Sequence, residues 1–198
     1  MDVPETPTTV PPLAVPAPLT SEGLSLRAGP VPVPLQLQIP SLGVSAPVLG
    51  VGMTSKNVMD APMGPANDPV WQEAFWYRGS AVPGAPSTAL IAGHVSAYGR
   101  LDVFGHIDKL RPGDLIVIHD TRSGLDVRFS VTDSMSYSLA QTADPAILTQ
   151  IYGVGPVKGT GPQPSADGLA HLTLITCAGT FTNGTHDHRL VVYATRVG

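Results

Sequence analysis

The chain has 198 residues, enough for one domain with a sizeable hydrophobic core and an appendage. Only 13% of the residues are charged and the formal net charge is −4, so the sequence has no basic patch, and nucleic acid and anionic membranes are poor candidate partners. The single cysteine excludes an internal disulfide bond, and no apolar run is long enough to predict a membrane-spanning helix.

The first 34 residues contain nine prolines and show no hydrophobic period. Such a stretch cannot bury enough apolar surface to offset the entropy that is lost on ordering. We therefore predict a flexible tether over residues 1–34 and a folded domain over residues 35–198. An arm that lies in a groove of that domain is the alternative, and Leu24 to Leu26 are compatible with a short packed turn. Met1 to Thr20 lack the basic start and apolar stretch of a signal peptide.

The folded part opens with two predicted strands and a long connection. Leu35 to Ile39 alternates apolar and polar residues, which predicts a half-buried strand, and Gly43 to Val48 predicts the second. Residues 49–87 show no period, and their glycine, proline, asparagine and aspartate residues predict a turn-rich connection. Four aromatic side chains are expected to pack this connection against the domain. They are Trp71, Phe75, Trp76 and Tyr77.

The middle of the chain predicts three further strands and one short helix. Thr88 to Ala92 is apolar and reads as a strand. Asp102 to Leu110 carries apolar residues at helical spacing and predicts a short helix. Leu115 to His119 and Asp126 to Thr132 predict the two strands of a hairpin.

The last part of the chain predicts a second short helix and two final strands. Asp144 and Pro145 are typical of an N-cap and first turn, here of a short helix that ends at Tyr152 and precedes a Gly/Pro-rich loop. His171 to Thr176 and Leu190 to Thr195 predict strands. Seven or eight short strands with two short helices in the connections predict an all-β fold, a closed or nearly closed barrel.

The last two predicted strands bring an unusual pair of side chains together. If they pair antiparallel, the end of the first and the start of the second lie at one edge of the sheet. Because side chains alternate along a strand, Cys177 and Arg189 then project from one face, opposite to that of Leu172 and Leu174. A lone cysteine is most often a small buried hydrophobe. A thiol beside a guanidinium at a strand end nevertheless indicates a candidate site.

Histidines supply the other candidates. His94 follows Gly93 at the end of an apolar strand, where a lone histidine is more often structural than catalytic. Arg189 has a simple alternative role as an ion-pair partner of Asp187. His186, Asp187 and His188 form an incomplete zinc set without a second cysteine, so we expect no metal. No phosphate-binding loop is evident, and we expect no cofactor.

Three segments, taken in order, carry a family resemblance. Ala92-Gly-His-Val95, Thr173-Leu-Ile-Thr-Cys177 and His188-Arg-Leu-Val-Val-Tyr-Ala194 resemble motifs of the sortases, the cysteine transpeptidases of Gram-positive cell surfaces. The similarity runs from about Leu35 to Val197. Cys177-Ala-Gly-Thr-Phe181 and Tyr77-Arg-Gly79 are most similar to the actinobacterial class F enzymes.

The resemblance implies an eight-stranded barrel as the catalytic domain and assigns roles to its residues. Cys177 would be the nucleophile that forms a thioester, His94 the general acid and base, and Arg189 the donor to the developing oxyanion. Three residues and the segment 133–168 are expected to line the substrate groove. These three residues are Thr176, Ala178 and His188.

The resemblance also implies partners and a location. The substrate would be a sorting-signal peptide of the LPxTG type, cleaved between Thr and Gly, and the acceptor an amine of cell-wall peptidoglycan. Sortases usually carry an N-terminal membrane anchor. We expect this chain to start after such an anchor, with Met1 added for expression, and to act at the extracellular face of the cell membrane.

Two alternatives remain open at this point. The first is a cysteine hydrolase of the same fold, which would use water as the acceptor. The second is a non-catalytic extracellular β-module that binds peptide and whose cysteine is merely buried. Thiol reactivity separates the two, because a buried cysteine resists iodoacetamide in the folded protein.

Overall fold

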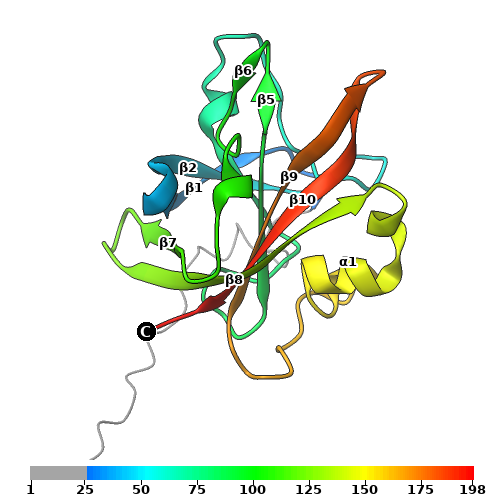
Figure 1. The fold of residues 1–198 in the computed structure, drawn as a ribbon. Coiled ribbons are helices and arrows are strands. Elements are labelled where there is room, and N and C mark those ends of the chain that lie inside the picture. Colours follow the sequence, from blue (N-terminus) through cyan, green and yellow to red (C-terminus); the bar gives the residue numbers. More distant parts are fainter. Residues whose placement is uncertain (1–25) are drawn as a thin grey trace, which may run out of the picture.

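The structure is a computed structural model, and it describes residues 26–198. Most of the predicted tether and most of the predicted turn at 24–26 therefore lie outside the described residues. Eight strands close into a barrel in the order β1-β2-β3-β4-β9-β10-β8-β7 (Figure 1), which confirms the predicted eight-stranded all-β barrel. The barrel strands are β1 (Val31–Ile39), β2 (Val44–Val51), β3 (Ala74–Tyr77), β4 (Thr88–Gly93), β7 (Leu115–Asp120), β8 (Asp126–Ser138), β9 (His171–Thr182) and β10 (Thr185–Arg196).

Shorter elements sit in the connections. A small two-stranded sheet, β5 (Ser96–Ala97) and β6 (Arg100–Leu101), projects beside the β9–β10 hairpin at one end of the barrel (Figure 1). The single α-helix among the described residues is α1 (Pro145–Tyr152), and none of the helices in this range is long and apolar enough to cross a membrane. Asp144 caps α1 as predicted, because its Oδ1 accepts a hydrogen bond of 2.7 Å from the Ala146 N–H.

The barrel interior follows the predicted alternation of side chains. Leu35, Leu37 and Ile39 of β1 are buried inside the barrel. Leu172 and Leu174 of β9 belong to the same core cluster, as predicted. The other face of β9 and β10 is covered as well. Around α1 a second apolar cluster forms, which contains Tyr77, Leu90, Tyr137, Ile151 and Val191.

Two predictions about the connections were wrong. Residues 49–87 contain β3, a four-residue strand that pairs parallel to β2 and antiparallel to β4. All four of its residues are buried, so it has no alternation by which it can be recognised. The segment Asp102 to Leu110 is not a helix, since only Ile107–Lys109 form a 3₁₀ turn. Its apolar side chains are buried all the same, and they join the barrel core.

Several strands are longer than predicted: β1 begins at Val31, inside the predicted tether, and β8, β9 and β10 differ most from their predicted ranges. β8 continues to Ser138, and β9 and β10 extend through the predicted loop 178–188 to meet at Asn183 and Gly184. These two residues have φ angles of 54° and 82°, and Asn-Gly is the preferred pair for a tight hairpin turn of this kind. The hairpin therefore projects well beyond the barrel (Figure 1).

Contacts of residues 26–30 indicate where the folded domain begins. The Met53 N–H donates to the carbonyl of Leu26 at 2.7 Å, and Nη2 of the fully buried Arg78 donates to the carbonyl of Ala28 at 2.9 Å. A Cβ atom at Gly52 would lie 1.9 Å from the Leu26 carbonyl oxygen, so this approach requires glycine. We propose that the domain starts at or before Leu26, ahead of the predicted boundary at residue 35.

A pair of truncated chains tests this boundary. A chain that starts at Val31 should melt about 3 °C or more below a chain that starts at Leu26. The reason is that the buried side chain of Arg78 loses a hydrogen-bond acceptor, which lowers the free energy of unfolding by about 1–3 kcal/mol. Thermal unfolding followed by circular dichroism is the measurement. Equal melting temperatures would show that residues 26–30 are part of the tether.

Candidate active site

Cys177 and Arg189 lie directly opposite each other on adjacent strands. They are paired in the antiparallel register of β9 and β10, as the alternation of side chains predicted. Cys177 is the only cysteine in the sequence, and it is partly exposed rather than buried. The thiol and the guanidinium therefore share one edge of the sheet.

The register of β4 brings His94 to the same edge. β4 runs parallel to β9, and Ala92 pairs with Ile175. Two residues further along each strand stand His94 and Cys177, so both leave the barrel at the same level. The Thr176 hydroxyl connects β9 to the end of β4, because it donates a 2.7 Å hydrogen bond to the carbonyl of Gly93.

Gly93 is needed for this arrangement. A Cβ atom at this position would lie 2.6 Å from Cδ2 of Phe104 and 2.9 Å from Cγ1 of Val103. Only glycine allows the segment after β6 to pack this closely against the strand end. The residue before His94 thus fixes how the histidine emerges from the barrel.

Aromatic side chains hold the His94 ring. The centroid of the Trp71 ring lies 4.7 Å from that of His94, and the Phe75 centroid lies 5.3 Å away. Nε2 of His94 is 2.8 Å from the carbonyl oxygen of Pro62, which accepts a hydrogen bond when that nitrogen carries a proton. All three contacts come from residues 49–87, that is, from the connection and from the strand β3 within it. The sequence predicted that the aromatic residues of this segment pack the connection against the barrel, and it did not predict that they contact the site.

Arg189 is not paired with Asp187. Its Nη1 donates to the carbonyls of His188 at 2.8 Å and His186 at 3.3 Å. No hydrogen bond from Nε or Nη2 to another described residue is present, so these donors are free to bind a group in the neighbouring cleft. Hydrogen bonds from the His188 side chain and from the Thr180 N–H lower the pKa of Asp187, so this carboxylate has partners other than Arg189.

Two clefts meet at Cys177 and His94. The first, which we call the Arg189 cleft, has a volume of about 530 Å³ and is lined by Arg189, Thr176 and mostly apolar side chains. The apolar lining includes Met59, Phe75, Leu148, Ile151, Tyr152 and Ile175. The second, the Trp71 cleft, has a volume of about 680 Å³. It is lined by Met63, Trp71, Tyr98, Phe181 and His186 besides Cys177 and His94.

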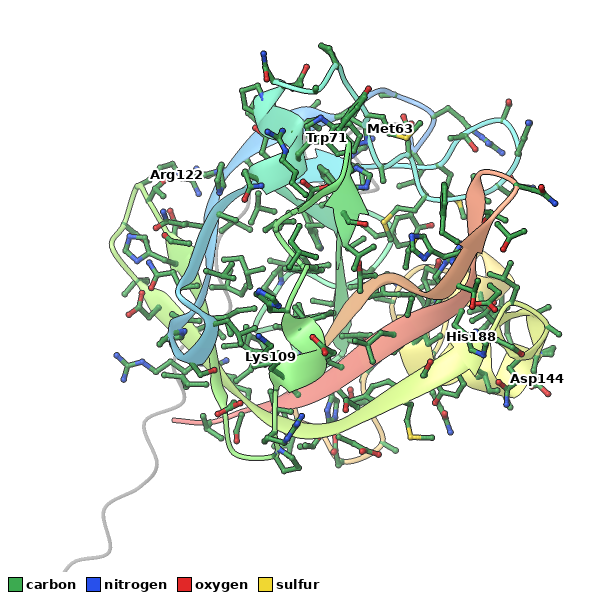
Figure 2. All side chains as sticks on the ribbon, turned by 45° about the horizontal axis from the view of Figure 1, so that its top comes forward. Met63, Trp71, Lys109, Arg122, Asp144 and His188 are labelled. Atoms are coloured by element: carbon green, nitrogen blue, oxygen red, sulfur yellow. The ribbon has the colours of Figure 1, made fainter. Side chains whose placement is uncertain are left out.

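The predicted substrate-groove residues separate in the structure. Thr176 lines the Arg189 cleft, and the segment 133–168 contributes Leu148 and Ile151 to it. Ala178 and His188 line neither cleft. Figure 2 shows His188 well away from Met63 and Trp71, which line the Trp71 cleft.

The histidines near the hairpin tip do not converge on one point. His186 stacks against Phe181 with 5.0 Å between ring centroids, whereas Nδ1 of His188 lies 2.7 Å from Oδ1 of Asp187. Within residues 26–198 no group of three or more histidine, cysteine, aspartate or glutamate side chains is arranged to hold a metal ion.

Comparisons with known proteins agree on one family. The family model of the sortase domain matches residues 37–197. Sortase C-1 from Actinomyces oris is 22% identical over 85% of this chain and 76% of that chain, with a TM-score of 0.56. A lid mutant of sortase A from Corynebacterium diphtheriae is also 22% identical, over 88% and 74% of the two chains, with a TM-score of 0.56. No curated protein matches. The predicted class F subtype is not confirmed by these matches.

Proposed function

Since this chain belongs to the sortase family, we propose that Cys177, His94 and Arg189 are its catalytic residues and that it transfers sorting-signal peptides to an amine acceptor. The observation that carries this proposal is the common level of the three residues: Cys177 and Arg189 are paired within β9 and β10, and His94 directly follows the end of the adjacent strand β4. It is the arrangement that acyl transfer needs: a nucleophile, a proton carrier and a cationic hydrogen-bond donor around one reacting carbonyl.

The proposed reaction has two steps on Cys177. The thiolate attacks the threonine carbonyl of an LPxTG-type signal, and a bond from Sγ to carbon forms while the bond to the glycine nitrogen breaks. His94 gives its proton to the leaving glycine amine. The acceptor amine then attacks the thioester, His94 takes up a proton from it, and the thiolate leaves.

Arg189 would stabilise the negative oxygen that develops in both steps. Its guanidinium is anchored by two backbone carbonyls through Nη1, and this leaves Nε and Nη2 available. A pair of fixed donors lowers the energy of an oxyanion without reorganisation at the moment of reaction. The absence of an ion pair with Asp187 counts against a merely structural role.

The two clefts suit the two substrates. We assign the acyl part of the sorting signal to the Arg189 cleft, because its apolar walls and Arg189 can hold a leucine- and proline-containing peptide with its carbonyl at Cys177. The Trp71 cleft opens on the other side of Cys177, beside His94. The leaving glycine and then the acceptor amine would occupy it in turn, since both must reach the same proton carrier.

The acceptor and the setting follow the family. We propose a peptidoglycan amine of the cell wall as acceptor and the extracellular face of the membrane as the place of action. A peptide-binding module with an inert thiol is disfavoured, because Cys177 is partly exposed and lines both clefts. The hydrolase alternative differs only in the acceptor, so an assay has to separate it.

A peptide assay tests the function and separates it from hydrolysis. A fluorogenic LPxTG-type peptide should be cleaved between Thr and Gly, and with triglycine present mass spectrometry should find the triglycine-coupled product in excess of the free acid. Cys177→Ala should abolish cleavage while its melting curve stays near that of the parent chain. Free acid alone, at any triglycine concentration, would identify a hydrolase.

Substitutions at Arg189 test the oxyanion role. Arg189→Ala should lower kcat/KM by roughly a hundredfold or more, because about 3 kcal/mol of transition-state stabilisation is lost. Arg189→Lys should recover only part of this loss, since lysine restores the charge but not the planar fork of donors. Arg196→Ala, on the same strand but away from both clefts, is the matched control. Near-normal kcat/KM in Arg189→Ala would remove Arg189 from the site.

A further inference from the structure

A third cavity, with a volume of about 620 Å³, lies on the outer face of the sheet. Its size falls within the range of roughly 300–1,000 Å³ that is typical of small-molecule sites. No residue that lines it also lines the Arg189 cleft or the Trp71 cleft, so it is a separate site. We call it the Tyr193 cavity. Its polar lining includes Thr88, Tyr137, Gln150, Thr173 and Tyr193.

The base of the Tyr193 cavity is a row of side chains from three adjacent strands. Thr173 of β9 pairs with Tyr193 of β10, and Tyr193 pairs in turn with Asp133 of β8. Because side chains alternate along a strand, this row lies on the same face as Cys177 and Arg189. Cys177 stands four residues beyond Thr173, about 13 Å along β9 at the rise of an extended strand. The backbone of β9 and β10 is paired on both sides here, so recognition of a ligand falls to side chains.

Helix α1 and the loop that follows it form the walls. Leu148 and Ile151 of α1 line the Arg189 cleft, whereas Thr149 and Gln150, on the other side of the helix, line the Tyr193 cavity. The loop 153–170 runs from α1 to the start of β9 (Figure 1). Hydrogen bonds of 2.6 and 3.0 Å tie this loop to the segment that precedes β4. The cavity is therefore formed by elements that are fixed to one another.

Polar groups in the cavity have hydrogen-bonding capacity that the protein does not use. Thr173 is 1% exposed and Thr88 is 8% exposed, yet neither hydroxyl has a hydrogen-bond partner among the described residues. Neither hydroxyl oxygen is fully enclosed, so both can be satisfied from within the cavity. The hydroxyls of Tyr193 and Tyr137 lie 3.2 Å apart, and Tyr137 donates to Oε1 of Gln150 at 3.5 Å. This leaves the amide N–H groups of Gln150 and an acceptor site on each tyrosine oxygen for a ligand.

The charges around the cavity favour a neutral ligand. No lysine or arginine is among the described residues that line it, so a buried anion would have no counter-charge. Both ring nitrogens of His171 have partners, because Asp167 and Thr195 each lie 3.1 Å away. Asp133, at the outer end of the row, is exposed, and one exposed carboxylate contributes little to binding a cation. Burial raises the pKa of Tyr193, which keeps its hydroxyl neutral.

We propose that the Tyr193 cavity binds a short neutral saccharide. The hydroxyl groups of a sugar both donate and accept, which matches the mixture of hydroxyls, amides and one carboxylate around the cavity. The C–H groups of a sugar ring suit the apolar part of the lining, which includes Met135 and Val154, and the rings of the two tyrosines. This inference does not depend on the catalytic roles proposed above.

An NMR titration of the full chain tests the site. The ¹⁵N-labelled protein is titrated to millimolar concentrations with tri-N-acetylchitotriose and, separately, with maltotriose. At least one of the two saccharides should cause saturable shifts of the amide signals of Gln150, Thr173 and Tyr193, while that of Asn183 at the hairpin tip stays in place. A response to the acetylated sugar alone would support a cell-wall glycan as the source of the ligand. A response to maltotriose would support sugars without acetamido groups.

Substitutions in the cavity identify the groups that bind. Tyr193→Phe and Thr173→Val each remove one hydroxyl and keep the shape of the side chain. Each should weaken saccharide binding by about threefold or more, because a neutral hydrogen bond is lost. Thr121→Val removes a hydroxyl from the turn between β7 and β8 and is the matched control, which should leave Kd unchanged. If a buried variant fails to fold, Gln150→Ala removes the amide donors from an exposed position of α1.

The proposal is overturned if neither saccharide causes saturable shifts, or if the shifts are confined to the Arg189 cleft or the Trp71 cleft. An affinity that none of the cavity variants alters would overturn it as well. So would saturable binding of inorganic phosphate to the same amides in place of a saccharide. The titration involves no peptide cleavage, so a failure of the proposed transpeptidase activity would leave its result unchanged.

Discussion

The relative register of three strands is the constraint on which the rest of the site depends. β4 and β9 pair in parallel with Ala92 opposite Ile175, and β9 and β10 pair antiparallel with Cys177 opposite Arg189. Together the two pairings bring His94, Cys177 and Arg189 to one edge of the barrel, although the chain separates the first from the last by 95 residues. A shift of one residue in either pairing would turn a side chain to the opposite face. The hydroxyl of Thr176 on the carbonyl of Gly93 and the tight packing at Gly93 hold that register where it matters.

The barrel supplies the rigid part of the site, and the connections supply its walls. α1 covers the outer face of β9 and β10 and provides Ile151 and Tyr152 to the Arg189 cleft. The long connection between β2 and β3 brings Pro62 and Trp71 to His94 from the other side. Loops that differ in length and side chains on one rigid barrel can therefore change what the two clefts bind without disturbing the arrangement of His94, Cys177 and Arg189.

The predictions from the sequence succeeded where the structure of a segment depends on residues close to it in the chain. They failed where it depends on contacts with distant segments. The alternation in His171 to Thr176 and in Leu190 to Thr195 was enough to place Cys177 and Arg189 on one face, and Asp144-Pro145 was enough to predict the cap of α1. β3 has no alternation, because it is buried on every side and pairs with a strand from the other end of a long connection. The extension of the hairpin to Asn183-Gly184 was missed, although this pair is a known turn signal. The burial of Asp102 could not be predicted either, because nothing in the neighbouring residues indicates it.

Capture of the covalent intermediate tests the central claim most directly. The chain is mixed with an LPxTG-type peptide without an amine acceptor, quenched in acid within seconds and examined by intact-protein and peptide mass spectrometry. The account predicts a mass increase equal to the peptide up to its threonine, located on Cys177 and released by hydroxylamine, as expected of a thioester. Peptide cleavage without such an adduct, or an adduct on another residue, would contradict the assignment of Cys177 as the nucleophile.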